Sequence, residues 1–159
     1  DDHGEKKQYT PSVFIADQNY IKALGIKIIK GNNFSQNAES NKNKCIINES
    51  LAKLFPNRHL IGHELPGENN LIVIGIVKDF NYASVKKYIK PSYISYRNNG
   101  LYLMVKPAKG QTKHVREIIS KTWDKLIPDY PVNIRSIGDR YEWLNRENKN
   151  YANLIGACS

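Results

Sequence analysis

The sequence LIVIGIV, residues 71–77, is the longest unbroken apolar run of the chain, and KDF follows it at 78–80. A run of this length, rich in β-branched residues and preceded by the turn signal PGENN at 66–70, predicts a buried strand. It is far shorter than the roughly 20 apolar residues that a transmembrane helix needs. The run therefore predicts a sheet core over residues 71–78 and no membrane span within it.

Toward the N-terminus, short apolar runs alternate with residues that cap or stop helices. We expect strands over residues 12–16 (SVFIA), 26–29 (IKII) and 44–47 (KCII). Asp17 is expected to cap a short helix over 18–24, because its carboxylate can accept hydrogen bonds from free amides. Gly25 is expected to end that helix.

A surface loop and a second capped helix surround the third expected strand. Residues 31–43 are rich in Asn and Ser, which predicts the loop. Asn48 is expected to cap a helix over 49–55, with Glu49 in the first turn, where a negative charge favours the helix dipole. Pro56 ends this helix.

Past residue 80 the pattern predicts a short turn or helix up to Tyr88 and then a hairpin. Pro91 is expected to start an edge strand at 92–96, which the turn NNG at 98–100 joins to a second strand at 101–106.

The last third of the chain predicts the longest helix. Thr112 is expected to cap it and Pro128 to close it. Its apolar face is expected to comprise Val115, Ile118, Ile119, Thr122, Trp123, Leu126 and Ile127. A short strand at 132–135 and a final helix over 136–150 are expected to follow.

Charge is unevenly distributed along the 159 residues, whose 24 Lys and Arg and 15 Asp and Glu give a formal net charge of +9. Residues 80–116 contain no acidic side chain, and tyrosines are interleaved with their basic residues. The candidate surface for an anionic partner comprises Lys86, Lys87, Lys90, Arg97 and Lys106. Its tyrosines are Tyr82, Tyr88, Tyr93, Tyr96 and Tyr102. Nucleic acid and lipid headgroups are the alternative partners, although tyrosines in strands more often pack on a sheet than stack on bases.

No pattern of catalytic or ligand-binding residues stands out. The chain has no G-x-S-x-G, no S-x-x-K and neither glycine-rich phosphate loop. His59 and His63 are four residues apart, but they lie in an expected loop and are interpreted as two exposed side chains rather than zinc ligands. His3, His114, Cys45 and Cys158 have no partners in the sequence pattern. The sequence therefore predicts no enzyme, no cofactor and no metal site.

Six short blocks, in order, resemble a known family. They are DQNYIKALGI at 17–26, GNNF at 31–34, IINESLA at 46–52, IG at 61–62, IGIVKDF at 74–80 and IKP at 89–91. Together they resemble the MacB-like periplasmic core domain of FtsX-like ABC transporter permeases, especially those of Bacteroidetes. Asn32 and His63 depart from the family pattern, which has Arg and Lys there, and a strand and helix that the family places upstream of Ser12 are absent from this sequence.

The resemblance implies a fold and a set of structural residues. The fold is α+β, with a mixed sheet and helices packed on one side, in two small lobes, one porter-like and one inserted. The implied divisions are a lead-in at 1–11, the core domain at 12–150, and a stalk or the start of a transmembrane helix at 151–159. The family-motif residues, all expected to serve structure, are Asp17, Gly25, Gly31, Asn48, Glu49, Gly62, Gly75, Asp79, Phe80 and Pro91.

The resemblance also implies a function. The chain would be a non-catalytic domain at the periplasmic face of the bacterial inner membrane, between two transmembrane helices of a permease. It would transmit ATP-driven motion, with an ATPase subunit or domain in the cytoplasm as an indirect partner. A periplasmic protein or an exported substrate would be the direct partner, and nucleic acid is not expected.

Overall fold

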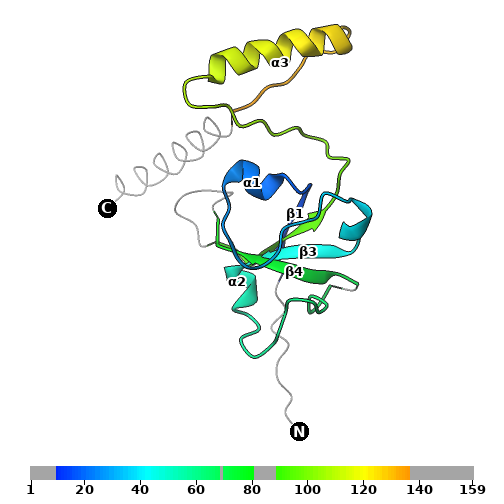
Figure 1. Ribbon diagram of the computed structural model, residues 1–159, viewed down its shortest axis with the longest axis vertical. Coiled ribbons are helices and arrows are strands. Elements are labelled where there is room, and N and C mark those ends of the chain that lie inside the picture. Colours follow the sequence, from blue (N-terminus) through cyan, green and yellow to red (C-terminus); the bar gives the residue numbers. More distant parts are fainter. Residues whose placement is uncertain (1–9, 69, 81–88, 137–159) are drawn as a thin grey trace, which may run out of the picture. The chain divides into compact units, whose positions relative to one another are not determined.

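The computed structural model describes residues 10–68, 70–80 and 89–136. Five strands form one mixed sheet in the order β1-β5-β3-β4-β2 (Figure 1). They are β1 (Ser12–Ala16), β2 (Ile28–Gly31), β3 (Lys44–Asn48), β4 (Ile72–Val77) and β5 (Ser92–Tyr96). β1 with β5 and β3 with β4 are parallel pairs, whereas β2 with β4 and β3 with β5 are antiparallel. The prediction of an α+β fold with a mixed sheet is confirmed.

The two short helices, α1 (Tyr20–Leu24) and α2 (Glu49–Ala52), cover opposite faces of this sheet (Figure 1). Ile21 of α1 packs in a cluster with Phe34, Ile46, Val77 and Ile94. Leu51 of α2 packs in a second cluster with Cys45, Ile47, Leu60, Leu65, Val73 and Tyr93. The expectation of helices on one side is therefore wrong. The physical reason is that central strand β3 is apolar on both faces, so each face needs a cover.

Two glycines set the contact between β2 and β4. Gly31 has a φ of 72°, and a Cβ on it would lie 2.3 Å from the carbonyl oxygen of Ile74. A Cβ on its partner Gly75 would lie 2.4 Å from the carbonyl oxygen of Asn32. The N–H of Asn32 donates to Ile74 O at 2.9 Å. Only glycine fits this close backbone approach at either position.

The N-terminal elements differ in detail from the prediction. Asn19, not Asp17, occupies the cap position of α1, and the Asp17 carboxylate instead accepts from the N–H of Asn19 at 3.0 Å. Gly25 ends α1 with a φ of 68°, as expected. β2 lies two residues later than predicted, and α2 ends at Ala52 rather than at residue 55.

The loop at 31–43 is more ordered than its composition indicates. It contains the single 3₁₀ turn η1 (Glu39–Asn41), and both Phe34 and Asn41 are buried. The Asn41 side chain accepts from Ser35 N at 2.8 Å and donates to Ser35 O at 2.7 Å, which closes the loop upon itself.

Four predictions for the C-terminal half are wrong. β5 lies between β1 and β3, so Pro91 does not start an edge strand. Residues 101–106 and 132–135 form no strand, because a strand needs a backbone partner and none of the described residues pairs with them. Gln111 occupies the cap position of α3 (Thr112–Leu126), so Thr112 is its first helical residue rather than its cap.

The chain divides into two compact units. The described part of the first is residues 10–68, 70–80 and 89–104, and that of the second is residues 105–136. The first holds the sheet, α1 and α2. In the second, the Trp123 indole donates to Tyr130 O at 2.6 Å, and the Arg116 guanidinium donates to Ile134 O at 3.1 Å. These bonds hold the segment after α3 alongside that helix.

Several expectations fall on residues that lie outside the described ones. They concern the lead-in up to residue 9, the turn or helix at 81–88, the final helix and the stalk or transmembrane helix start at 151–159. In the part that is described, no helix combines the length and the apolarity needed to cross a bilayer.

Candidate functional site

Four polar residues of the family-motif blocks meet where β3 and β4 end and α2 begins. They are Asn48, Glu49, Ser50 and Asp79, called here the polar junction. Because β3 and β4 are parallel, their carboxyl ends lie at the same end of the sheet, which brings residues 48–50 to Asp79.

The Asp79 carboxylate binds the start of α2 with both oxygens. Its Oδ1 accepts from Ser50 N–H at 2.9 Å, and its Oδ2 accepts from the Ser50 hydroxyl at 2.7 Å. In return, Glu49 Oε2 accepts from the N–H of Asp79 at 3.1 Å. Three hydrogen bonds thus join the end of β4 to the first turn of α2.

Asn48 joins the same turn to β5. Its Oδ1 accepts from Leu51 N–H and from Ser92 N–H, both at 2.9 Å, and its Nδ2 donates to Lys90 O at 3.0 Å. The side chain is buried, with 1% relative exposure, so its polar atoms exchange water for these protein partners. The expected cap of α2 is present, and it also fixes the start of β5.

The polar junction has the chemistry of a structural joint. Its carboxylates accept from groups of the fold itself, and the amides of Ser50 and Leu51, which a helix start would otherwise leave free, are bonded to Asp79 and Asn48. Phe80 extends the joint by packing its ring 5.7 Å from that of Phe14 in β1.

Among the remaining family-motif residues, Pro91 lies between Lys90 and Ser92, which Asn48 binds, and the glycines serve other parts of the sheet and its loops. Gly31 and Gly75 face each other across β2 and β4, whereas Gly62 has a φ of 84° with open space around it. The carbonyl of Pro91 accepts from Ser12 N–H at 2.9 Å, which starts the pairing of β1 with β5. Each of these residues serves the fold through its backbone rather than through a polar side chain.

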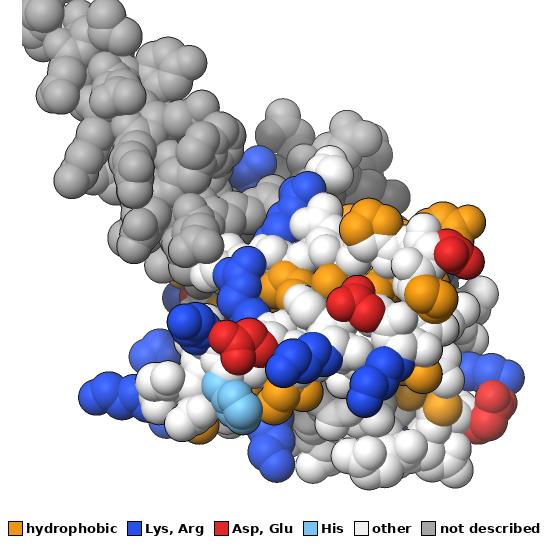
Figure 2. Space-filling view, turned by 90° about the horizontal axis from the view of Figure 1, so that it is seen from above, with side chains coloured by type: hydrophobic (Ala, Val, Ile, Leu, Met, Phe, Trp, Pro, Cys, Tyr) orange, Lys and Arg blue, Asp and Glu red, His pale blue; other side chains and the backbone are white. Residues whose placement is uncertain are grey.

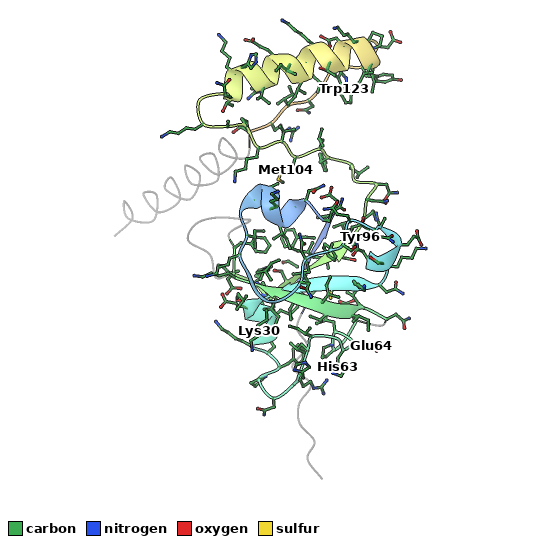
Figure 3. All side chains as sticks on the ribbon, viewed as in Figure 1. Lys30, His63, Glu64, Tyr96, Met104 and Trp123 are labelled. Atoms are coloured by element: carbon green, nitrogen blue, oxygen red, sulfur yellow. The ribbon has the colours of Figure 1, made fainter. Side chains whose placement is uncertain are left out.

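His59 and His63 do come together, with ring centroids 5.8 Å apart and nearly perpendicular planes. Both are exposed, and Figure 3 shows His63 beside Glu64 in the loop between α2 and β4. Among the described residues no group of three or more His, Cys, Asp or Glu side chains could hold a metal ion. His114 lies on α3 in the second unit.

The structure describes three of the five basic residues of the candidate surface for an anionic partner. In the first unit, Lys90 and Arg97 are exposed at opposite ends of β5, while Lys106 belongs to the second unit. Lys86 and Lys87 lie outside the described residues. On the face seen in Figure 2, Lys and Arg side chains are interspersed with acidic and hydrophobic ones.

Two of the interleaved tyrosines serve the fold. Tyr93 is buried in the α2-side cluster, and the Tyr96 hydroxyl donates to Gln18 Oε1 at 3.2 Å while its ring lies 5.3 Å from Phe34. Tyr102, by contrast, is 93% exposed. These three tyrosines therefore do not form a row of rings on which bases could stack.

Burial perturbs two ionisable groups under α2. The pKa of the Cys45 thiol is raised to about 12, mainly by burial and further by the charge of Glu68. The pKa of Tyr93 is also raised, by burial first and then by the charge of Glu68 and the hydrogen bond with it. Both groups are neutral at neutral pH, so Cys45 is not a thiolate nucleophile.

Sequence reasoning missed Ser50, Gln18 and Asn41 as structural residues. Ser50 lies 29 positions from Asp79, and Gln18 lies 78 positions from Tyr96. Such contacts carry no local signal. Asn41 closes its own loop over six positions, and a short-range side-chain turn of this kind is typical of Asn in loops.

Comparison with known proteins identifies the family. The model of the MacB-like periplasmic core domain family matches residues 2–121. No curated protein sequence matches significantly. Among solved structures, the chain is similar to the periplasmic region of MacB from Actinobacillus actinomycetemcomitans, with 16% identity and a TM-score of 0.49. That match covers 69% of this chain and 54% of the MacB chain, so this chain spans about half of it. Since the family model matches three quarters of the sequence, the chain belongs to the MacB-like periplasmic core domain family.

Proposed function

We propose that this chain is a non-catalytic extracytoplasmic domain of an ABC transporter permease, at the periplasmic face of the bacterial inner membrane. In this role it passes motion driven by ATP hydrolysis in the cytoplasm to a periplasmic protein or an exported substrate. Its membrane attachment is through helices on either side of the domain, the second beginning near residues 151–159. Family membership supports the transporter context.

The observation that carries the proposal is the polar junction. A domain that transmits force needs its elements to move together, and hydrogen bonds from Asn48 and Asp79 tie β3, β4, β5 and α2 at one end of the sheet. In the polar junction, the family-motif side chains bond to other groups of the fold rather than presenting a reactive group to a ligand. This use of the motif favours a mechanical role over a chemical one.

The test uses the complete transporter in lipid vesicles. A donor fluorophore on Lys53→Cys, an exposed position at the end of α2, is combined with Cys158→Ser and with acceptor lipids in the outer leaflet. ATP is expected to change energy transfer between the domain and the membrane. Hydrolysis without any such change would contradict the proposal.

A matched pair of variants connects this motion to the polar junction. Asp79→Ala removes both acceptors of Ser50 and is expected to reduce the ATP-dependent change while hydrolysis continues. Glu39→Ala removes a carboxylate whose ion pair with Lys42 is solvent-exposed, so it is expected to have no effect. We also expect the complete gene to encode an apolar run of about 20 residues on each side of the domain.

A further inference from the structure

The two edges of the sheet differ in how they are protected. The β2 edge carries Lys30, a register shift between Ile28 and Lys30, and Gly31 at positive φ. A lysine, a bulge and a kink are the means by which proteins keep edge strands from pairing. The β1 edge, with the sequence SVFIA at 12–16, has neither a charge nor a proline, and its register with β5 is regular.

Alternate backbone groups of β1 make no bond to β5 and point to the side where a further strand could pair. Ser12 N–H donates to Pro91 O, and Ala16 O accepts from Arg97 N–H, both at 2.9 Å. In a parallel pair these bonds recur at every second residue, so the backbone groups of Val13 and Ile15 point away from β5. No strand that the structure describes pairs with this side of β1.

The same two residues also expose apolar side chains. Phe14 and Ala16 pack in the α1-side cluster, so Val13 and Ile15 lie on the opposite face, where α2 packs against β3, β4 and β5. Val13 is 52% exposed and Ile15 is 54% exposed. A further strand at this edge would shield both side chains.

Charge at this edge indicates the chemistry of the strand that fits. Lys90, two residues before β5, and Arg97, directly after it, are both exposed, and β5 is the neighbour of β1. At about 3.3 Å per residue, the seven steps between them span about 23 Å. A strand with one carboxylate near each of its ends would match both cations.

We propose that the edge of β1 opposite β5 binds an extended segment of a separate periplasmic polypeptide by strand addition. That segment alternates apolar residues and has acidic residues about seven positions apart, opposite Lys90 and Arg97. Main-chain hydrogen bonds to Val13 and Ile15 hold it, and the two cations fix its register. The inference rests on the proposed function for the role of this partner, since the partner is what the domain would move.

The test measures amide hydrogen exchange of this chain with a blocked eight-residue peptide that has Glu at both ends and Val alternating with Thr between. The expected result is about tenfold or greater protection of the Val13 and Ile15 amides at saturating peptide. Unchanged exchange at both amides, or protection confined to another segment, overturns the proposal.

Variants at both edges distinguish strand addition from simple charge attraction. Ile15→Lys adds a charge at an exposed position and is expected to weaken peptide binding about tenfold or more. Val13→Pro removes an outward N–H, and is expected to do the same. Ile29→Lys, the matched change on the β2 edge, is expected to leave binding unaltered. Arg97→Glu with Lys90→Glu is expected to weaken binding and to reverse its dependence on salt, because added salt then screens a repulsion.

Two further results complete the design. Binding that survives Ile15→Lys and disappears with added salt would mean charge attraction alone and overturns strand addition. Because this assay contains no transporter or ATP, its failure leaves the proposed transmission of motion standing. Conversely, peptide binding to a domain that does not respond to ATP would reject transmission and retain the docking strand.

Discussion

Gly31 and Gly75 face each other where the backbones of β2 and β4 leave no room for a side chain. Gly62 offers a natural control, because it also has positive φ but has nothing within 4 Å of an added Cβ. Gly31→Ala is therefore expected to lower the free energy of unfolding by about 3 kcal/mol or more, through strain and a clash with backbone atoms. Gly62→Ala is expected to cost about 1 kcal/mol, through strain alone.

Urea unfolding of the two variants beside the wild-type chain measures this difference. Equal losses would show that positive φ, and not the close approach of β2 and β4, decides the cost at Gly31. Gly75→Ala is expected to behave like Gly31→Ala, because its Cβ would meet the carbonyl oxygen of Asn32.

Cys45 makes stability depend on alkaline pH. Its pKa is raised from the ordinary value of 9.0 to about 12 in the folded chain, so the unfolded chain loses this proton first. The stability that the protonated Cys45 thiol contributes is therefore fully present below about pH 9. As the pH rises from about 9 toward 12, the free energy of unfolding falls by up to about 1.4 kcal/mol per pH unit. Cys45→Val removes the thiol while keeping an apolar side chain in place.

Denaturant unfolding of both proteins at pH 7.5 and pH 10 isolates this effect, since Tyr93 and the lysines are common to both. The wild-type chain is expected to lose more stability than Cys45→Val over this range. A constant difference between the two would mean that the buried thiol does not titrate in this way.

At the scale of elements, α2 depends on its cap far more than α1 does. Asn48 makes three hydrogen bonds, whereas Asn19, in the equivalent position of α1, makes no side-chain bond to its helix. Asn48→Ala is expected to cost about 3 kcal/mol, because it leaves buried partners in α2 and β5 unsatisfied. Asn19→Ala is expected to cost about 0.5 kcal/mol.

Thermal or urea unfolding of the two alanine variants is the measurement. Similar losses would imply that the hydrogen bonds of Asn48 to α2 and β5 add little to stability. Retained binding of α2 to the sheet in Asn48→Ala, seen as unchanged protection of the Leu51 amide, would point the same way.

The elements that sequence predicted well are those whose signal is local. The apolar run at 71–78 became β4, and Asn48 before a first-turn Glu49 marked the start of α2. Strand order was not predictable, because the burial of β5 between β1 and β3 depends on pairings between residues about 45 to 80 positions apart. Residues 101–106 have a strand-like sequence, but strand propensity forms no strand without a partner.

Three of the four residues of the polar junction were predictable from the sequence, whereas Ser50 and the contacts between the four were not. Asn48, Glu49 and Asp79 were identified from blocks that resemble a family, and Asn48 was expected to cap a helix. The bonds between Asp79 and Ser50 arise only because β3 and β4 are parallel neighbours in the folded sheet. That adjacency is a property of the fold, so no short stretch of sequence could encode it.

At the scale of the whole molecule, burial is concentrated in the first unit. Every buried side chain among the described residues lies between Ile21 and Ile94, and α3 has none. Amides of α3 are therefore expected to exchange hydrogen faster than those of β3 and β4, because few apolar contacts oppose the opening of this helix. Gly31→Ala is expected to accelerate exchange in β3 and β4 and to leave α3 unchanged. Exchange measured residue by residue tests this, and a parallel acceleration in α3 would show that the two units open as one.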